Sequence, residues 1–235
     1  MKSALVAFLC VGYCAPVFAS LGSAMEILKL PPENRRSVAQ EKGDEVYSHF
    51  VTVAFNDDQP MNLRWRALMA ASEARGEKAT DDLLKAGSHD QWFMRNAALV
   101  ALKEVNPDQA TKLAQKLVKD KALVVRSAAV LVLEENSAPE IRELLWAELD
   151  QSYNFKNSES LWIRHQIVEA LAKNPKMQEL KQFAKLLSDK DVRLQSPAIQ
   201  GLEKITGVRL GSESTATSKL VGLWKNYIKK ESLAL

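Results

Sequence analysis

Hydrophobic and polar positions follow the period of an α-helix along most of the chain, and one pattern recurs five times. The five copies align on a position that is arginine in four of them and glutamine in the last: Arg66, Arg95, Arg126, Arg164 and Gln195. The residues one before, three after, four after and seven after this anchor are apolar in nearly every copy. Because such positions form one stripe of a helix, each copy predicts a helix with one buried face.

A second amphipathic stretch precedes most of these helices. Residues 107–120 begin with Pro107, and residues 137–150 begin with Ser137 and Pro139, which are typical of helix starts. No stretch has the alternation that would predict a strand. The anchors are 29, 31, 38 and 31 residues apart, so the unit is a pair of helices of about 31 residues. One pair cannot bury its apolar face alone, and we expect the pairs to stack into an all-α solenoid.

The repeated second helix, for example "VRSAAVLVL" from Val125, resembles the HEAT repeats of the short bacterial type, also called PBS-lyase-type repeats. The resemblance implies a right-handed α-solenoid of about five helix pairs, with extra N-terminal helices and a C-terminal capping helix. It also implies that an aspartate about six residues before the arginine pairs with it and ties successive turns together. Asp120 fits Arg126, Asp189 would meet Gln195, and Asp90 could substitute one residue later in its copy.

The first 19 residues are typical of a secretory signal peptide. Lys2 precedes an apolar run, and Val17 and Ala19 suit a cleavage site after Ala19. The alternative, an uncleaved anchor, is disfavoured because the run is shorter than the ~20 residues of a membrane span. Cys10 and Cys14 both lie in this segment, so the mature protein would have no cysteine and no disulfide. We expect an exported protein, periplasmic or secreted.

The remaining boundaries follow from prolines, glycines and the repeat. We expect short N-terminal helices in residues 20–43, the repeat solenoid in 44–207, and a loop with a capping helix in 208–235. The capping helix would bury an apolar stripe and expose a polar outer face. Together with the signal segment in residues 1–19, these four parts account for the whole chain.

Charge and motifs exclude several classes of function. The chain has 32 basic and 29 acidic residues, a formal charge of +3, which becomes +2 without the signal segment. That balance argues against nucleic acid and against an anionic membrane surface, and we expect no stable membrane insertion after signal cleavage. His49, His89 and His165 lie far apart without a metal-binding motif, and no nucleotide or nucleophile motif occurs. We therefore expect no metal, no cofactor and no catalytic residues.

The repeat arginines Arg66, Arg95, Arg126 and Arg164 allow two interpretations. They could line one face and bind an anionic partner, or each could bond a carboxylate or helix-end carbonyl near the neighbouring turn. Their constant register with the buried positions favours the structural interpretation.

The resemblance implies that the second helices line the concave face of the stack. Positions one and five after the anchor would then be candidates for partner binding: Asn96, Val100, Ser127, Leu131, His165 and Glu169. Alternatively, Val100 and Leu131 pack between helices. The 38-residue spacing contains an insertion in residues 151–160 that would project Tyr153 and Phe155. Trp92 and Trp162, at the turn before the second helix, either pack or form part of a surface.

These observations favour a non-catalytic scaffold that is exported to the cell envelope and binds an unidentified protein or peptide. Two alternatives stay open. HEAT-like helices also build enzymes, such as DNA-alkylation-repair glycosylases and chromophore lyases. The protein could also be a structural component of the envelope.

Overall fold

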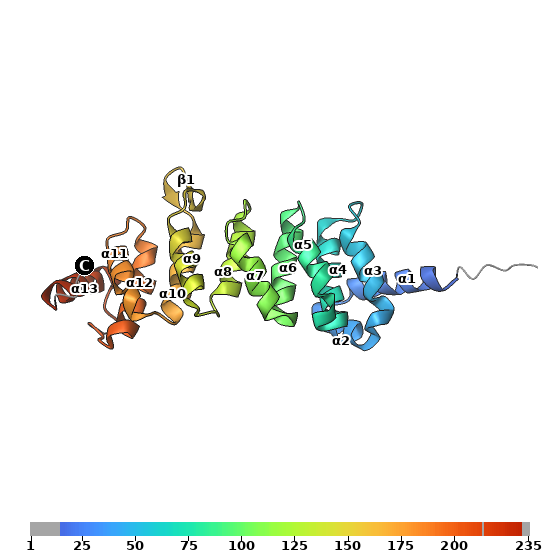
Figure 1. Ribbon diagram of the computed structural model, residues 1–235, viewed down its shortest axis with the longest axis horizontal. Helices are drawn as coiled ribbons and strands as arrows, with labels where there is room; N and C mark the ends of the chain where they lie inside the picture. The colour runs from blue at the N-terminus through green and yellow to red at the C-terminus, as the bar shows by residue number, and fades with distance from the viewer. Residues whose placement is uncertain (1–14, 213, 232–235) are drawn as a thin grey trace, which may run out of the picture. The chain divides into compact units, whose positions relative to one another are not determined.

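The protein, as a computed structural model, is a succession of packed α-helices with one short β-hairpin (Figure 1). The structure describes the backbone of residues 15–212 and 214–231, with side chains from Leu21 onward. These residues fall into two compact units that meet in sequence between Ala86 and Gly87.

The first unit pairs two long helices and flanks them with others. Its elements are α1 (Ala15–Lys29), α2 (Pro32–Lys42), α3 (Asp44–Phe55), α4 (Met61–Arg75), a 3₁₀ turn (Gly76–Ala79) and α5 (Thr80–Gly87), which reaches the boundary. Helices α3 and α4 pack along each other, α2 packs on α4, and α1 packs on α3. Helix α1 runs through the predicted cleavage site after Ala19. The rest of the predicted signal segment, residues 1–14, lies outside the described residues, so export stays a prediction.

The second unit contains most of the repeats. Its elements are α6 (Trp92–Val105), α7 (Pro107–Leu117), α8 (Leu123–Leu133), α9 (Pro139–Leu149), η2 (Ser152–Asn154), β1 (Phe155–Lys156), β2 (Glu159–Ser160), α10 (Trp162–Lys173), η3 (Met177–Glu179), α11 (Leu180–Leu186), η4 (Val192–Leu194), α12 (Gln195–Thr206) and α13 (Thr217–Lys230). The second helices pack in succession, α6 on α8, α8 on α10 and α10 on α12. We call α6, α8, α10 and α12 the B helices of this unit.

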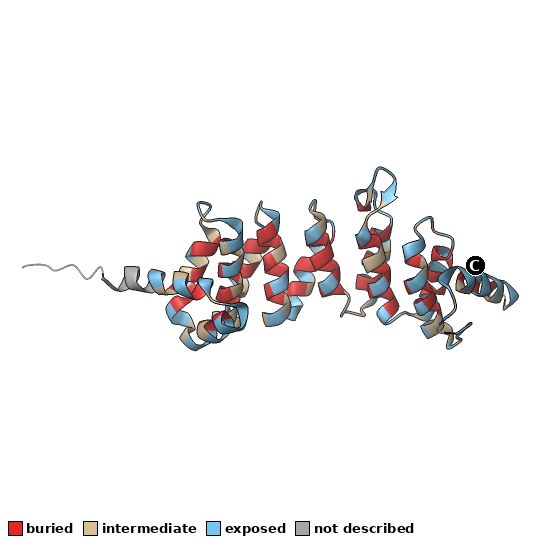
Figure 2. Ribbon diagram, turned by 180° about the vertical axis from the view of Figure 1, so that it is seen from behind, coloured by how far each residue is buried: buried red, intermediate tan, exposed pale blue. Residues whose placement is uncertain are grey.

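The recurring apolar columns form the core of each unit. Figure 2 shows the buried residues on the inner sides of the helices and the exposed residues on the outer sides. Met94, Leu99 and Leu102 of α6 are fully buried, and their counterparts in the later B helices are at most 4% exposed. Small residues permit the close packing, since a Cβ added at Gly201 would lie 2.7 Å from the ring of Phe183. The helix pattern thus defines which face of each helix is inside.

One anchor that we predicted from the sequence is wrong. Arg66 is exposed, whereas Arg64, two residues earlier on α4, is only 1% exposed. The Nε of Arg64 donates to the carbonyl of Ala54 at 2.9 Å, and its Nη1 lies 2.7 Å from Asp57. With Arg64 as anchor, the first spacing becomes 31 residues, as in the neighbouring copies. Ala71 then fills the apolar position that Glu73 had broken.

The expected pairing of each aspartate with the arginine of its own repeat is also wrong. Asp120 receives two hydrogen bonds from Arg95 of the preceding repeat, from Nε at 2.6 Å and from Nη2 at 2.8 Å. Arg126 instead donates to the backbone carbonyl of Asp120, at 2.7 Å. Asp189 likewise pairs with Arg164, at 2.9 Å, so it does not need an arginine at position 195. Arg95 and Arg164 therefore link their B helices to the loop of the next repeat.

We call the hydrogen bonds from Arg95, Arg126 and Arg164 to the loop of the next repeat the arginine ladder. At the insertion, the acceptor is not an aspartate. Arg126 donates from Nε to the side chain of Asn154, at 3.0 Å, and from Nη2 to the carbonyl of Tyr153, at 2.9 Å. The insertion forms a small hairpin, which we did not expect from the sequence. Its strands are only two residues long, and Asn157 and Ser158 have positive φ values of 51° and 65°. Such a pair suits a tight hairpin turn.

A second buried ion pair joins α9 to η3, the 3₁₀ turn that precedes α11. Arg142 donates two hydrogen bonds of 2.6 Å to Glu179, and Trp146 adds a third from its indole nitrogen at 3.0 Å. Arg142 also donates to the carbonyl of Leu171 at 2.8 Å. Nothing in the repeat pattern pointed to this pair, because neither residue occupies a recurring position.

The corrected register predicts very different costs for two neighbouring arginines. We expect Arg64→Ala to lower the free energy of unfolding by about 2 kcal/mol, because it leaves buried acceptors such as the Ala54 carbonyl unpaired. Arg66→Ala on the same helix should change it by less than about 0.5 kcal/mol. Urea unfolding monitored by circular dichroism checks both values. Equal costs for the two variants would contradict the corrected register.

The arginine ladder predicts that, between the same two repeats, a buried carboxylate contributes more to the free energy of unfolding than an exposed one. We expect Asp120→Ala to cost about 3 kcal/mol, since it leaves the buried Arg95 without its counter-charge. The matched control is Glu135→Ala, which breaks the exposed 2.9 Å pair with Lys103 between α6 and α8 and should cost under about 1 kcal/mol. A cost for Asp120→Ala as small as the control would mean that the ladder adds little to stability.

The ladder also predicts acid sensitivity. Burial alone would raise the pKa of Asp120 and Asp189, but hydrogen bonds from Arg95 and Arg164 outweigh it and hold each pKa below its usual value. The same balance with Arg142 lowers the pKa of Glu179. Because the folded pKa is depressed, this stability is present above about pH 4 and is lost as the pH falls below it. We expect the urea midpoint to drop steeply from pH 4.5 to 2.5, and less steeply in Glu179→Gln.

Candidate functional site

Exposed apolar side chains recur at one place in every repeat of the second unit. Trp92, Val124, Trp162 and Val192 are 43%, 41%, 47% and 67% exposed, and each stands in the first turn leading into a B helix. We call these four residues the first-turn row. Met61 of the first unit has the corresponding position in α4 and is 50% exposed. A place that keeps an exposed apolar side chain in every repeat is a property of the repeat, not an isolated surface residue.

The sequence had placed Trp92 and Trp162 outside the periodic columns. In the corrected register, the row lies two or three residues before the anchor. Trp92, Val124 and Trp162 each directly precede a buried apolar residue. Phe93 shows the contrast, since it is 6% exposed while Trp92 beside it is 43% exposed. The two rings meet edge to face, with centroids 6.2 Å apart. Trp92 is therefore held by the core on one side and open to solvent on the other.

Two further apolar side chains lie along the same helices. Val100 is 37% exposed and Leu131 is 45% exposed, so neither is packed between neighbouring B helices. Both lie two turns after the first-turn row, and Glu169 and Gln200 take the equivalent places on α10 and α12, also exposed. We call the exposed sides of these helices, from the first-turn row to the level of Val100, the B-helix face. Of the ten exposed large hydrophobic residues among the described side chains, six lie on it.

Polar side chains in the middle of the B-helix face bind neighbouring helices. Ser127 is only 8% exposed, and its hydroxyl donates to Gln166 of α10 at 2.9 Å, so its expected role in partner binding does not fit its position. Asn96 donates to the carbonyl of Val124 at 3.4 Å. His165 lies 3.3 Å from Glu169 on its own helix, and both remain partly open to solvent. The bonds of Ser127 and Asn96 hold adjacent B helices in register.

We had expected the hairpin to project Tyr153 and Phe155 freely into solvent, and the structure does not bear this out. The guanidinium of Arg126 lies over the Tyr153 ring at 5.2 Å, and that of Arg164 over the Phe155 ring at 4.7 Å. The Tyr153 hydroxyl donates to the buried Glu148, and burial together with this bond raises the pKa of Tyr153. Both rings thus cover the arginine ladder, although Tyr153 keeps 37% of its surface exposed.

Ion pairs line the far end of the B-helix face. Lys103 of α6 lies 2.9 Å from Glu135, and Lys173 of α10 lies 2.8 Å from Glu134. Lys103 also donates to the carbonyl of Leu131 at 3.2 Å. The apolar residues are therefore bordered on this side by charged groups, which is the arrangement of an interface core with a polar rim.

A hollow of about 930 Å³ lies between the hairpin and the loop before α12. Its charged groups are engaged with one another, since Arg164 bonds Asp189 and Arg193 bonds Asp191 at 2.8 Å. Burial would raise the pKa of Asp191, but hydrogen bonds from Arg193 and Ser160 lower it to about 2. The side chains described here include no group of three or more potential metal ligands. The hollow shows a structural ion-pair network.

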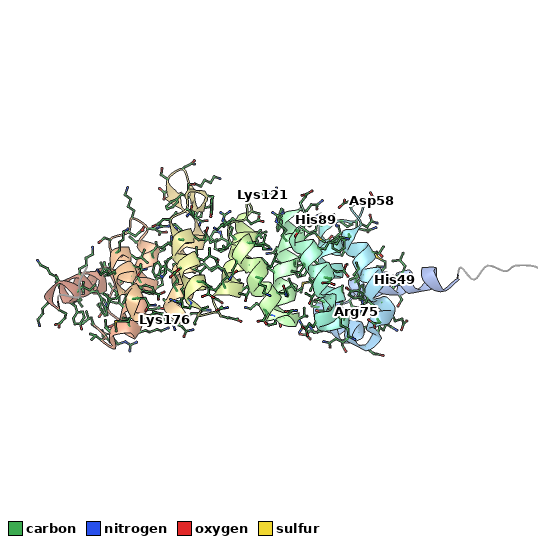
Figure 3. The ribbon with its side chains drawn as sticks, viewed as in Figure 1. His49, Asp58, Arg75, His89, Lys121 and Lys176 are labelled. Atoms are coloured by element: carbon green, nitrogen blue, oxygen red, sulfur yellow. The ribbon has the colours of Figure 1, made fainter. Side chains whose placement is uncertain are left out.

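The repeat arginines bond the loops that precede the B helices, and these loops lie at one edge of the second unit. Figure 3 shows His89 and Lys121, in the loops before α6 and α8, at one edge of this unit and Lys176 at the opposite edge. Arg95 donates to the carbonyl of His89 at 2.7 Å and to that of Asp90 at 2.7 Å. Arg95, Arg126 and Arg164 are at most 6% exposed, so their charges face protein oxygens and not solvent.

Comparison with known proteins supports the repeat assignment. A family model described as HEAT repeats matches residues 48–146, a span that reaches from α3 into α9. No curated protein matches the chain. Among the described residues, no helix combines the length and the apolar character needed to span a membrane. The repeated helix pairs and the family match agree, and residues 48–146 are similar to HEAT repeats.

Proposed function

We propose that this protein is a non-catalytic scaffold that binds another protein or peptide through the B-helix face of its second unit. Solenoid repeats offer extended surfaces on which each repeat contributes an equivalent set of side chains. The observation that carries the proposal is the concentration of exposed apolar residues on that face, led by Trp92 and Trp162. Tryptophan is enriched among residues that dominate binding energy, and apolar surface of this kind is normally covered.

The spacing of the B helices indicates how far apart the apolar side chains of the partner segment should lie. Packed helices lie about 8–10 Å apart, so a segment that crosses the B helices meets one first-turn residue per 8–10 Å. A polyproline-type segment places every third residue on one side, about 9 Å apart. A helical segment places every seventh residue on one side, about 10.5 Å apart. Either conformation would present apolar side chains at the repeat of the row.

The alternative of a DNA-alkylation-repair glycosylase has less support. A nucleic-acid partner of the repeats needs accessible cations on them, and Arg95, Arg126 and Arg164 are buried and bonded to protein oxygens. No arrangement among the described residues favours a chromophore lyase or a purely structural envelope protein over the binding scaffold.

We further propose that the protein acts outside the cytoplasm. The support is the basic, apolar and small-residue pattern of the first 19 residues, with cleavage after Ala19. The partner would then be a component of the cell envelope or a secreted protein.

Site-specific photo-crosslinking tests the binding face in living cells. We expect a benzoylphenylalanine at position 124 or 162 to capture a discrete partner, and one at Met177, which is 67% exposed outside the face, to capture none. The double variant Val100→Asp, Leu131→Asp should lose the crosslink, because charges would interrupt the apolar surface.

Two controls make the result decisive. The double variant must keep its helical circular dichroism, and Met177→Asp must keep the crosslink from position 162. Intact mass of the crosslinked protein also tests export, since a cleaved chain begins at Ser20. Equal capture from position 177, or capture that survives the double variant, would rule out the B-helix face as the binding site.

A further inference from the structure

The last helix of the second unit has two unlike sides. Figure 1 shows α13 at the end of the row of helices, beside α12. Val221, Trp224 and Ile228 are at most 8% exposed on its inner side, and the helix packs on α12. The outer side is open to solvent. The inner side accounts for the stability of α13, so the composition of the outer side calls for a separate explanation.

The outer side of α13 is basic without compensation. Lys219, Lys225, Lys229 and Lys230 are all exposed, and the helix contains no acidic residue. No hydrogen bond or ion pair among the described residues engages these four lysines, unlike Lys103 and Lys173 on the B helices. The chain as a whole carries +3, so the remainder of the chain carries −1 without them. The basic excess of the protein is therefore concentrated in one helix.

The lysines can reach a single plane. At 100° per residue, they span an arc of about 140° around the helix. Gly222 and Asn226, both exposed, lie in the middle of that arc, so its centre carries no long side chain. Lys219 and Lys230 are eleven residues apart, which places them about 16 Å apart along the axis. Leu223, 36% exposed, lies at the border of the same arc.

Helix stability does not explain this arrangement. Lys229 and Lys230 in the last turn interact favourably with the negative end of the helix dipole. Lys219, however, lies in the first turn, where a positive charge is unfavourable. Lys219 lies on the same side as the other three lysines, so the helix dipole does not account for the basic side as a whole.

We propose that the outer side of α13 docks on an anionic phospholipid surface. A bilayer is flat and presents many phosphate charges. Four lysines that reach one plane, with only short side chains between them, match such a surface. Each lysine near such a surface strengthens binding roughly fivefold. Leu223 can contact the interfacial region, while Trp224 stays packed on α12, so the helix lies on the surface without crossing it. The near-neutral total charge had argued against an anionic membrane only because it averages over this helix.

Vesicle co-sedimentation with the full chain tests the proposal. The probes are vesicles of 30% phosphatidylglycerol in phosphatidylethanolamine and vesicles of phosphatidylcholine alone. We expect binding to the anionic vesicles at 50 mM salt, with affinity at least tenfold weaker in the variant Lys219→Gln, Lys225→Gln, Lys229→Gln, Lys230→Gln. Raising the salt to 500 mM should remove the difference, because the attraction is electrostatic.

The matched control replaces four exposed lysines elsewhere, Lys78, Lys112, Lys116 and Lys181, by glutamine, and should bind like the unchanged protein. All three proteins keep the same N-terminal apolar segment, so their differences report on α13 alone. Equal binding of both quadruple variants would overturn the proposal, as would no binding to anionic vesicles at 50 mM salt. Tighter binding to duplex DNA or to polyglutamate than to vesicles would show that the partner is not a lipid surface. None of these outcomes bears on the B-helix face.

Discussion

The buried arginine that donates its hydrogen bonds across a repeat boundary is the interaction on which the second unit depends. Arg95, Arg126 and Arg164 each leave the B helix that carries them and bind the loop of the following repeat. A guanidinium suits this task because its fixed fork serves a side chain and backbone carbonyls at once. Because the guanidinium is buried, leaving it without acceptors would cost free energy of folding. The loops must therefore adopt one geometry.

That geometry determines which residues face solvent on the B helices. The loop that receives the arginine ends just before the first turn of the next B helix, where Val124, Trp162 and Val192 lie. Even the insertion keeps the arrangement, because Asn154 replaces an aspartate and the rings of Tyr153 and Phe155 cover the guanidinium groups. The exposed apolar row and the polar ladder are thus two consequences of one repeat. The basic side of α13 stands outside this logic, which is why it points to a separate role.

The sequence pattern was sufficient for the helical class and for most buried columns, because apolar spacing alone decides which side of a helix is inside. It was insufficient where two arginines competed, as Arg64 and Arg66 do, since both keep some apolar neighbours in register. It could not reveal that Asp120 pairs with Arg95, because a spacing of six residues suggests a partner in the same repeat. Ser127 and Tyr153 were expected to be open, but their hydroxyl groups bond Gln166 and Glu148. Those contacts join residues that no local pattern relates.

Hydrogen–deuterium exchange on Asp189→Ala tests the central claim most directly, because Asp189 follows α11 while its partner Arg164 lies on α10. Bonding across the repeat boundary predicts faster exchange both in the loop before α12 and in the first turns of α10 with the adjoining hairpin. Protection of α6 and α8 should stay unchanged. Faster exchange confined to the loop and α12, with α10 as protected as in the unchanged protein, would contradict the account.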